Sequence, residues 1–210
     1  MKKKSTLIAF YGGTFDPIHN GHVQSAIAIA KLVRLNKIIL LPNGIPVHRN
    51  MPKTSIEDRI NMIQLAISEI PENIFKIDYR EVRDLMPSWT FNTFKNIRCE
   101  YGPYKPIGFI LGQDSFLNLP NWYRGLELIN FCHLIVCSRS KYICNPKLNK
   151  IHPDILHYLP CGLIYYALTP VWNISSSIIR LRCHFGMSCN GLIATSVQKY
   201  IFKKKLYSDK

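Results

Sequence analysis

Two glycines and two histidines near the N-terminus have the types and spacing of a phosphate-binding site. The segment from Gly12 to His22 begins with Gly12-Gly13, directly after an apolar run, and later carries His19 and His22. Paired glycines allow the backbone to approach a phosphate closely and to point N–H groups at it. Histidines three residues apart at a helix start share one face, where both can donate to phosphate oxygens. The segment therefore predicts a polyphosphate site.

The same residues also have ordinary structural interpretations. A Gly-Gly pair can simply make a turn, a single histidine is more often structural than catalytic, and two histidines at this spacing can bind a metal. The seven cysteines, which lie between Cys99 and Cys189, contain no Cys-x-x-Cys pair. That pattern is typical of reduced thiols and not of a disulfide framework or a zinc site. We therefore expect no structural metal and a cytoplasmic location.

A second group of phosphate-binding side chains lies late in the chain. Ser175, Ser176 and Ser177 offer hydroxyl and N–H groups at an expected helix start, and Arg180 adds a planar guanidinium fork that suits phosphate oxygens. By itself this run could equally be a serine-rich helix cap with a surface arginine. Its meaning depends on whether it lies beside Gly12-Gly13.

Both segments resemble motifs of the nucleotidyltransferase superfamily related to class I aminoacyl-tRNA synthetases. Residues 12–22 are similar to Gly-Gly-x-Phe-Asp-Pro-x-His-x-Gly-His, and residues 174–180 to Ile-Ser-Ser-Thr-x-x-Arg, with Ser177 in place of threonine. The resemblance implies an ATP donor and three catalytic residues that stabilise phosphate charge, His19, His22 and Arg180. It implies an ATP site made of Gly12, Gly13, Thr14, Phe15, His19, His22, Ser175, Ser176, Ser177 and Arg180.

Three further segments resemble the bacterial nicotinate-nucleotide adenylyltransferases, a likeness that runs from Leu7 to about Tyr200. Residues 42–49 are similar to Pro-x-x-x-Pro-x-His-Lys/Arg, residues 87–90 to Pro-Ser-Tyr-Thr with Trp89 for tyrosine, and residues 112–122 to Gly-x-Asp followed by Leu-x-x-Trp. The resemblance implies that amides at the second segment cap the nicotinate carboxylate. It implies a nicotinate-nucleotide site made of His48, Arg49, Ser88, Trp89, Thr90, Asp114 and Trp122.

The implied roles fit the chemistry of the side chains. Asp114 can hydrogen-bond a ribose hydroxyl, and Trp122 can stack on a pyridine ring. A helix N-terminus at Ser88 to Thr90 favours an anionic nicotinate over a neutral carboxamide. As single residues, Asp114 could equally be a helix cap and Trp122 a core aromatic residue.

The reaction implied is adenylyl transfer from ATP to nicotinate mononucleotide, with Mg²⁺ accompanying ATP. Nicotinamide mononucleotide or phosphopantetheine as acceptor is the nearest alternative. A non-catalytic RNA-binding module is the alternative from another class, because the net charge is +14. Much of that charge, however, lies in basic tails at residues 1–4 and 203–210, so we expect small-molecule partners and no nucleic acid. The oligomeric state stays open.

The elements that must position these residues alternate along the chain. Short apolar runs alternate with stretches of helical periodicity, which predicts one doubly wound, mostly parallel, Rossmann-like α/β sheet with helices on both faces. We expect a single domain over residues 1–210, with a loop insertion of low order at residues 139–160, and no run long enough to span a membrane. The expected strands are 7–11, 37–41, 74–79, 107–111, 131–137 and 163–168, and helices are expected after residue 20 and at 55–70, 89–98, 175–185 and 192–202.

Overall fold

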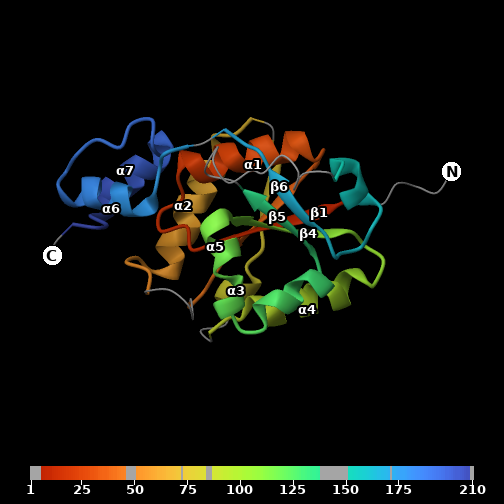
Figure 1. The fold of residues 1–210 in the computed structure, drawn as a ribbon. Coiled ribbons are helices and arrows are strands. Elements are labelled where there is room, and N and C mark those ends of the chain that lie inside the picture. Colours follow the sequence, from red (N-terminus) through yellow and green to blue (C-terminus); the bar gives the residue numbers. More distant parts are fainter. Residues whose placement is uncertain are drawn as a thin grey trace.

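The sheet of this protein is parallel and has the strand order β3-β2-β1-β4-β5-β6. A computed structural model describes residues 6–45, 51–71, 73–83, 87–137, 151–170 and 172–208. Within these ranges the predicted doubly wound α/β fold is confirmed (Figure 1). The strands are β1 (Ile8–Gly13), β2 (Ile38–Pro42), β3 (Phe75–Ile77), β4 (Ile107–Gly112), β5 (His133–Cys137) and β6 (Ile164–Ala167).

In the described part of the chain, five helices lie where the periodicity predicted them, and two short helices, at residues 80–83 and 113–117, were not predicted. The clearest local signal is Ser55, whose side chain accepts a hydrogen bond from the Asp58 backbone N–H and so begins α2. The helices are α1 (Asn20–Leu32), α2 (Ile56–Ser68), α3 (Arg80–Arg83), α4 (Thr90–Tyr101), α5 (Gln113–Leu117), α6 (Ser176–His184) and α7 (Thr195–Lys204), with 3₁₀ helices η1 (Leu119–Asn121), η2 (Gly125–Asn130) and η4 (Pro153–His157). Among them, no helix is both long and apolar enough to cross a bilayer.

Two apolar clusters cover the two faces of the sheet. Successive residues of a strand point to opposite faces, so Ala9 and Tyr11 belong to one cluster and Phe10 to the other. The first cluster includes α1, α2 and α7, and the second includes α4 and η2. Figure 1 shows α1 and α4 on opposite sides of the strands. Strands buried on both faces explain the continuous apolar runs that the sequence contains.

The crevice of this fold lies at its topological switch point. β1 is hydrogen-bonded to β2 on one side and to β4 on the other, and the chain leaves β1 toward β2. The carboxyl ends of β1 and β4, at Gly13 and Gly112, therefore diverge into connections on opposite faces, where α/β proteins bind ligands. Gly12-Gly13 and Asp114 come together there because of this strand order.

Two terminal or inserted segments are more ordered than their composition suggested. Residues 151–160 include η4, where Leu156 is fully buried and the His157 Nδ1 accepts from the Leu7 N–H. Residues 203 and 204 continue α7, and Tyr207 is bonded to the loop after β1. Residues 139–150 lie outside the described residues. Contacts with Leu7, just before β1, and with Asp16, in the loop after it, hold segments that local composition marks as loop or tail.

Candidate active site

A cleft of about 470 Å³ opens at the carboxyl ends of β1 and β4. It brings together the turn after β1, the starts of α4 and α6, and the segment after β4, which are far apart in the sequence. Most of the residues expected at either nucleotide site line this one cleft, namely Gly12, Gly13, Thr14, Phe15, His19, His22, Ser88, Thr90, Asp114, Trp122, Ser175, Ser176, Ser177 and Arg180.

Three expected residues are not placed in the cleft. Trp89 is the N-cap residue of α4 but does not line the cleft, and its ring packs against Tyr123 with 5.1 Å between ring centroids. The aromatic side chain that replaces the family's tyrosine therefore contacts a second aromatic residue of the chain. His48 and Arg49 lie outside the described residues.

The histidine pair forms a reciprocal cap at the start of α1. The His19 Nδ1 accepts from the His22 backbone N–H at 3.2 Å, and the His22 Nδ1 accepts from the His19 backbone N–H at 3.3 Å. The two rings are stacked, with centroids 3.6 Å apart. Because both Nδ1 atoms accept, each neutral ring carries its proton on Nε2. The cap thus selects the tautomer that can donate from Nε2, the chemistry expected for phosphate oxygens.

The glycine pair is required by packing as well as by the turn. A Cβ on Gly12 would lie 2.7 Å from the Phe109 ring, and a Cβ on Gly13 would lie 2.8 Å from the Phe15 ring. Phe15 itself is almost completely buried, and its ring lies edge-on to His22 with centroids 5.1 Å apart. Phe15 therefore supports the histidine pair from within the core while it borders the cleft.

The start of α6 is fastened to the loop that follows β1. The Arg180 guanidinium donates to the Asp16 carbonyl oxygen at 2.7 Å and to the Ser177 hydroxyl at 3.1 Å. The Ser176 hydroxyl donates to the Pro17 carbonyl oxygen, and the Ser175 hydroxyl caps the Ile178 N–H. The two segments expected to bind ATP are therefore adjacent. Ser176 donates its hydroxyl proton within the protein, whereas Ser175 and Ser177 accept hydrogen bonds and keep a proton that can be donated. The hydroxyls of Ser175 and Ser177, the first-turn N–H groups and the guanidinium are therefore the donors suited to phosphate.

Comparison with known proteins identifies the family. A protein-family model described as "Cytidylyltransferase-like" matches residues 10–182. A "Probable nicotinate-nucleotide adenylyltransferase" of Wigglesworthia glossinidia brevipalpis is 65% identical over 208 residues, which cover 98% of this chain and 99% of that protein. The protein of the same name in Baumannia cicadellinicola is 49% identical over 214 residues, 97% of this chain and 99% of the relative. This chain belongs to the nicotinate-nucleotide adenylyltransferase family.

Solved structures support the fold of this family member. Plasmodium falciparum nicotinic acid mononucleotide adenylyltransferase, in its complexes with APC and with NaAD, matches with a TM-score of 0.73. The match covers 96% of this chain and 97% of the solved chain, at 22% identity. At that identity the likeness establishes the Rossmann-like architecture, and the residues of the cleft carry the argument about chemistry.

Arg59 is a residue of this adenylyltransferase-family site that sequence reasoning missed. It is 1% exposed, and its guanidinium donates to the carbonyl oxygens of Thr14 at 2.9 Å, Asn43 at 2.7 Å and Gly44 at 3.1 Å. Burial lowers the pKa of this guanidinium. A charged residue on the apolar stripe of α2, three positions before the buried Met62, was the available signal. Arg59 joins the turn after β1 to the turn after β2.

Asp16 is the second residue that was missed. Its buried carboxylate accepts from the Lys53 backbone N–H, the Thr54 hydroxyl and the Tyr207 hydroxyl, each at 2.7 Å. Burial and the neighbouring Asp16 carboxylate raise the pKa of Tyr207. In this family member the C-terminal segment therefore helps to hold the loop after β1, in which the Asp16 carbonyl oxygen accepts from Arg180. No local pattern in the sequence links these positions.

Proposed function

We propose that this chain transfers the adenylyl group of ATP to the phosphate of nicotinate mononucleotide, releasing pyrophosphate and forming nicotinate adenine dinucleotide, a step of NAD biosynthesis. The observation that carries the proposal is the single cleft shared by the His19–His22 pair, the start of α6 with Arg180, and the start of α4 beside Trp122. Membership of the nicotinate-nucleotide adenylyltransferase family supports it, as does a fold shared with the Plasmodium falciparum nicotinic acid mononucleotide adenylyltransferase complexed with NaAD.

The mechanism relies on positioning and on charge stabilisation. The acceptor phosphate is an anion at neutral pH and attacks the α-phosphorus of ATP without a general base. One P–O bond forms to the acceptor oxygen, and the bond to pyrophosphate breaks. The Nε2–H groups of His19 and His22 donate to the transferred and leaving phosphates, and Arg180 neutralises the pyrophosphate end. Preorganised donors of this kind supply most of the rate enhancement in such transfers.

The acceptor lies at the start of α4 in this proposal. Trp89, the N-cap residue, makes no side-chain capping hydrogen bond, so the first-turn N–H groups of α4 receive no cap from that position. These N–H groups and the positive end of the helix favour a carboxylate over a neutral carboxamide. Trp122 stacks on the pyridine ring and Asp114 accepts from a ribose hydroxyl.

Magnesium enters the proposal as the companion of ATP. Two carboxylates that border the cleft are engaged within the protein, Asp16 by Lys53, Thr54 and Tyr207, and Glu81 by two hydroxyl groups. In the part of the chain that the structure describes, no group of three or more candidate ligand residues could hold a metal. The donor set therefore suits an ion held by ATP and water, and Asp114 is a third carboxylate in the lining of the cleft. Bound there, it would neutralise phosphate charge.

The proposal also places the enzyme in the cytoplasm with small-molecule nucleotide partners. The cysteines in the described ranges are free thiols, which suits a reducing compartment.

One experiment tests the proposed function. Pyrophosphate release from ATP is measured with magnesium and with nicotinate mononucleotide, nicotinamide mononucleotide or phosphopantetheine as acceptor. We expect the highest kcat/KM with nicotinate mononucleotide, because the α4 start favours an anion. A higher kcat/KM with the nicotinamide nucleotide would contradict the acceptor assignment. If none of the three acceptors supported pyrophosphate release, adenylyl transfer itself would be contradicted.

A further inference from the structure

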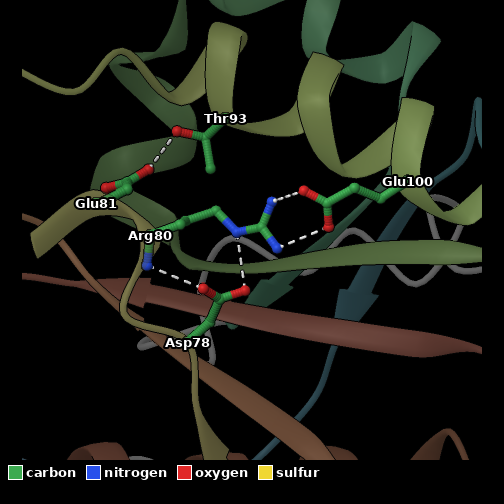
Figure 2. Close-up of polar contacts among 5 residues, drawn as sticks. All are labelled: Asp78, Arg80, Glu81, Thr93 and Glu100. Atoms are coloured by element: carbon green, nitrogen blue, oxygen red, sulfur yellow. Dashed lines mark hydrogen bonds and ion pairs between the residues drawn. The ribbon is translucent and has the colours of Figure 1, made fainter. Parts of the chain in front are cut away.

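Glu81 is a buried carboxylate at the edge of the cleft, and the mechanism above does not use it. It is 8% exposed and borders the cleft together with Ser88 and Thr90. The Ser88 hydroxyl donates to one carboxylate oxygen at 3.1 Å, and the Thr93 hydroxyl donates to the other at 2.6 Å, the contact drawn in Figure 2. Burying a carboxylate costs free energy unless the group is paired or hydrogen-bonded, so a buried carboxylate at the edge of a ligand cleft requires an explanation.

The two bonds of Glu81 bracket the first turn of α4. Ser88 precedes the N-cap residue, and Thr93 is the fourth residue of the helix, so the carboxylate holds the turn on both sides. Trp89 supplies no capping side chain. An acidic group near a helix start also interacts favourably with the positive end of the helix dipole. Glu81 therefore holds the first turn of α4 from α3 through two side-chain hydroxyls and not through the backbone N–H groups that an N-cap residue would bond.

α3 is itself anchored from the outer side by the residue before Glu81. The Asp78 carboxylate accepts from the Arg80 backbone N–H at 3.0 Å and from its Nε at 2.8 Å, and the guanidinium makes two bonds to Glu100 at 2.8 and 3.0 Å (Figure 2). Asp78 follows β3, and Glu100 lies in the last turn of α4. A four-residue helix has little stability of its own, so the two bonds between Asp78 and Arg80 hold the helix that carries Glu81, whereas the half-exposed Glu100 carboxylate contributes little.

We propose that Glu81 is a positioning residue for the acceptor nucleotide, acting through the first turn of α4. This inference rests on the proposed function, because it concerns the same acceptor site. A hydroxyl has one proton, so Ser88 and Thr93, which donate to Glu81, do not donate to the acceptor. The first-turn N–H groups of α4 are then the donors that meet the acceptor's carboxylate, and Glu81 sets where they point.

The charge of Glu81 adds a second effect. Burial raises the pKa of this carboxyl, and the hydrogen bonds from the Thr93 and Ser88 hydroxyls partly offset that rise by lowering the pKa. A negative charge beside the same helix start also weakens the attraction for an anionic acceptor. Variants that separate shape from charge are therefore required.

The test is steady-state kinetics on the full chain with wild type and five variants. Glu81→Ala should raise KM for nicotinate mononucleotide by about tenfold, the scale of losing two hydrogen bonds that hold the turn, with KM for ATP within about twofold and kcat within about threefold. Glu81→Gln keeps an accepting oxygen and should stay within about threefold of wild type for all three parameters. The Ser88→Ala, Thr93→Val double variant should reproduce the effect of Glu81→Ala, and adding Glu81→Ala to it should change KM by less than about twofold.

Glu100→Gln is the matched control. It removes a carboxylate of the same cluster that contacts Arg80 at the far end of α4, and it should leave both KM values unchanged. Equal effects of Glu81→Ala and Glu100→Gln, equal rises in both KM values, or additive effects in the triple variant would each overturn the inference. If Glu81→Ala does not fold, the Ser88→Ala, Thr93→Val variant removes the same bonds and must show the selective rise.

Wild-type activity distinguishes failure of the inference from failure of the proposed function. Should wild type prefer another acceptor, the proposed acceptor is wrong, and the same variants are compared with the acceptor it uses. Calorimetric titration of nicotinate mononucleotide into each variant gives the binding effect without turnover. A Kd that is unchanged in Glu81→Ala would overturn the inference.

Discussion

The histidine cap makes it possible to separate the structural and catalytic work of His22. The His22 Nδ1 accepts from the His19 N–H, and Nε2 is the expected donor to phosphate. Asparagine places its Oδ1 near the position of the histidine Nδ1 but has no atom at the position of Nε2. We therefore expect His22→Asn to keep the cap and to lose the donor.

The two losses have different sizes. Losing a helix cap costs about 1 kcal/mol of stability, so His22→Asn should change the free energy of unfolding by less than that. Losing one preorganised donor to the transition state lowers kcat by roughly 10² to 10³. His22→Ala loses both, and should show the same fall in kcat together with the loss of about 1 kcal/mol.

The assay is pyrophosphate release at saturating ATP and acceptor, paired with urea unfolding of each variant. His184→Asn is the matched control, since His184 is exposed on α6 and does not line the cleft, and it should match wild type. The reasoning is refuted if folded His22→Asn retains kcat within about threefold of wild type, or if it loses as much stability as His22→Ala.

Three further outcomes follow from the buried polar groups. Arg59→Lys should lower the free energy of unfolding by about 2–4 kcal/mol, because the three N–H groups of an ammonium radiate from one nitrogen and cannot reproduce bonds made from two guanidinium nitrogens; urea unfolding that shows no loss would contradict this. Tyr207→Phe should cost about 1.5–3 kcal/mol, measured by the same method, since it removes a donor to the Asp16 carboxylate. Burial lowers the pKa of His133 from 6.5, so the unfolded chain binds that proton more tightly and stability falls as pH drops below about 6.5. His133→Gln should flatten the difference in unfolding free energy between pH 7 and pH 5, and an unchanged slope would argue against this origin.

The order of elements and most of the cleft could be predicted from the sequence because both depend on short-range patterns. Apolar runs predict buried strands, and Ser55 predicts the start of α2, since a cap acts within one turn. The glycine pair ends β1, and the Ser175 to Arg180 run begins α6. In a parallel sheet the ends of strands and the starts of the following helices lie at the same edge, so the two segments meet there. The binding roles assigned to these residues stay predictions.

What local pattern could not supply were contacts between distant segments. The sequence predicts backbone amides around Trp89 at the acceptor site but does not predict that the Trp89 ring packs against Tyr123, more than thirty residues later. The tail after α7 was expected to be solvated, but Tyr207 reaches Asp16 across 191 residues of sequence. Partners at such separations are chosen by packing, which no local spacing encodes.

The sequence by itself determined the family, the alternation of strands and helices, and the residues that can meet phosphate. Only the tertiary structure decided how those residues are held: the Nε2–H tautomer of the histidines, the three carbonyl oxygens on Arg59, and Glu81 beneath the start of α4. The physical reason is that chemistry resides in side-chain type, whereas the direction of a proton or a lone pair depends on which partner the fold places within hydrogen-bonding distance.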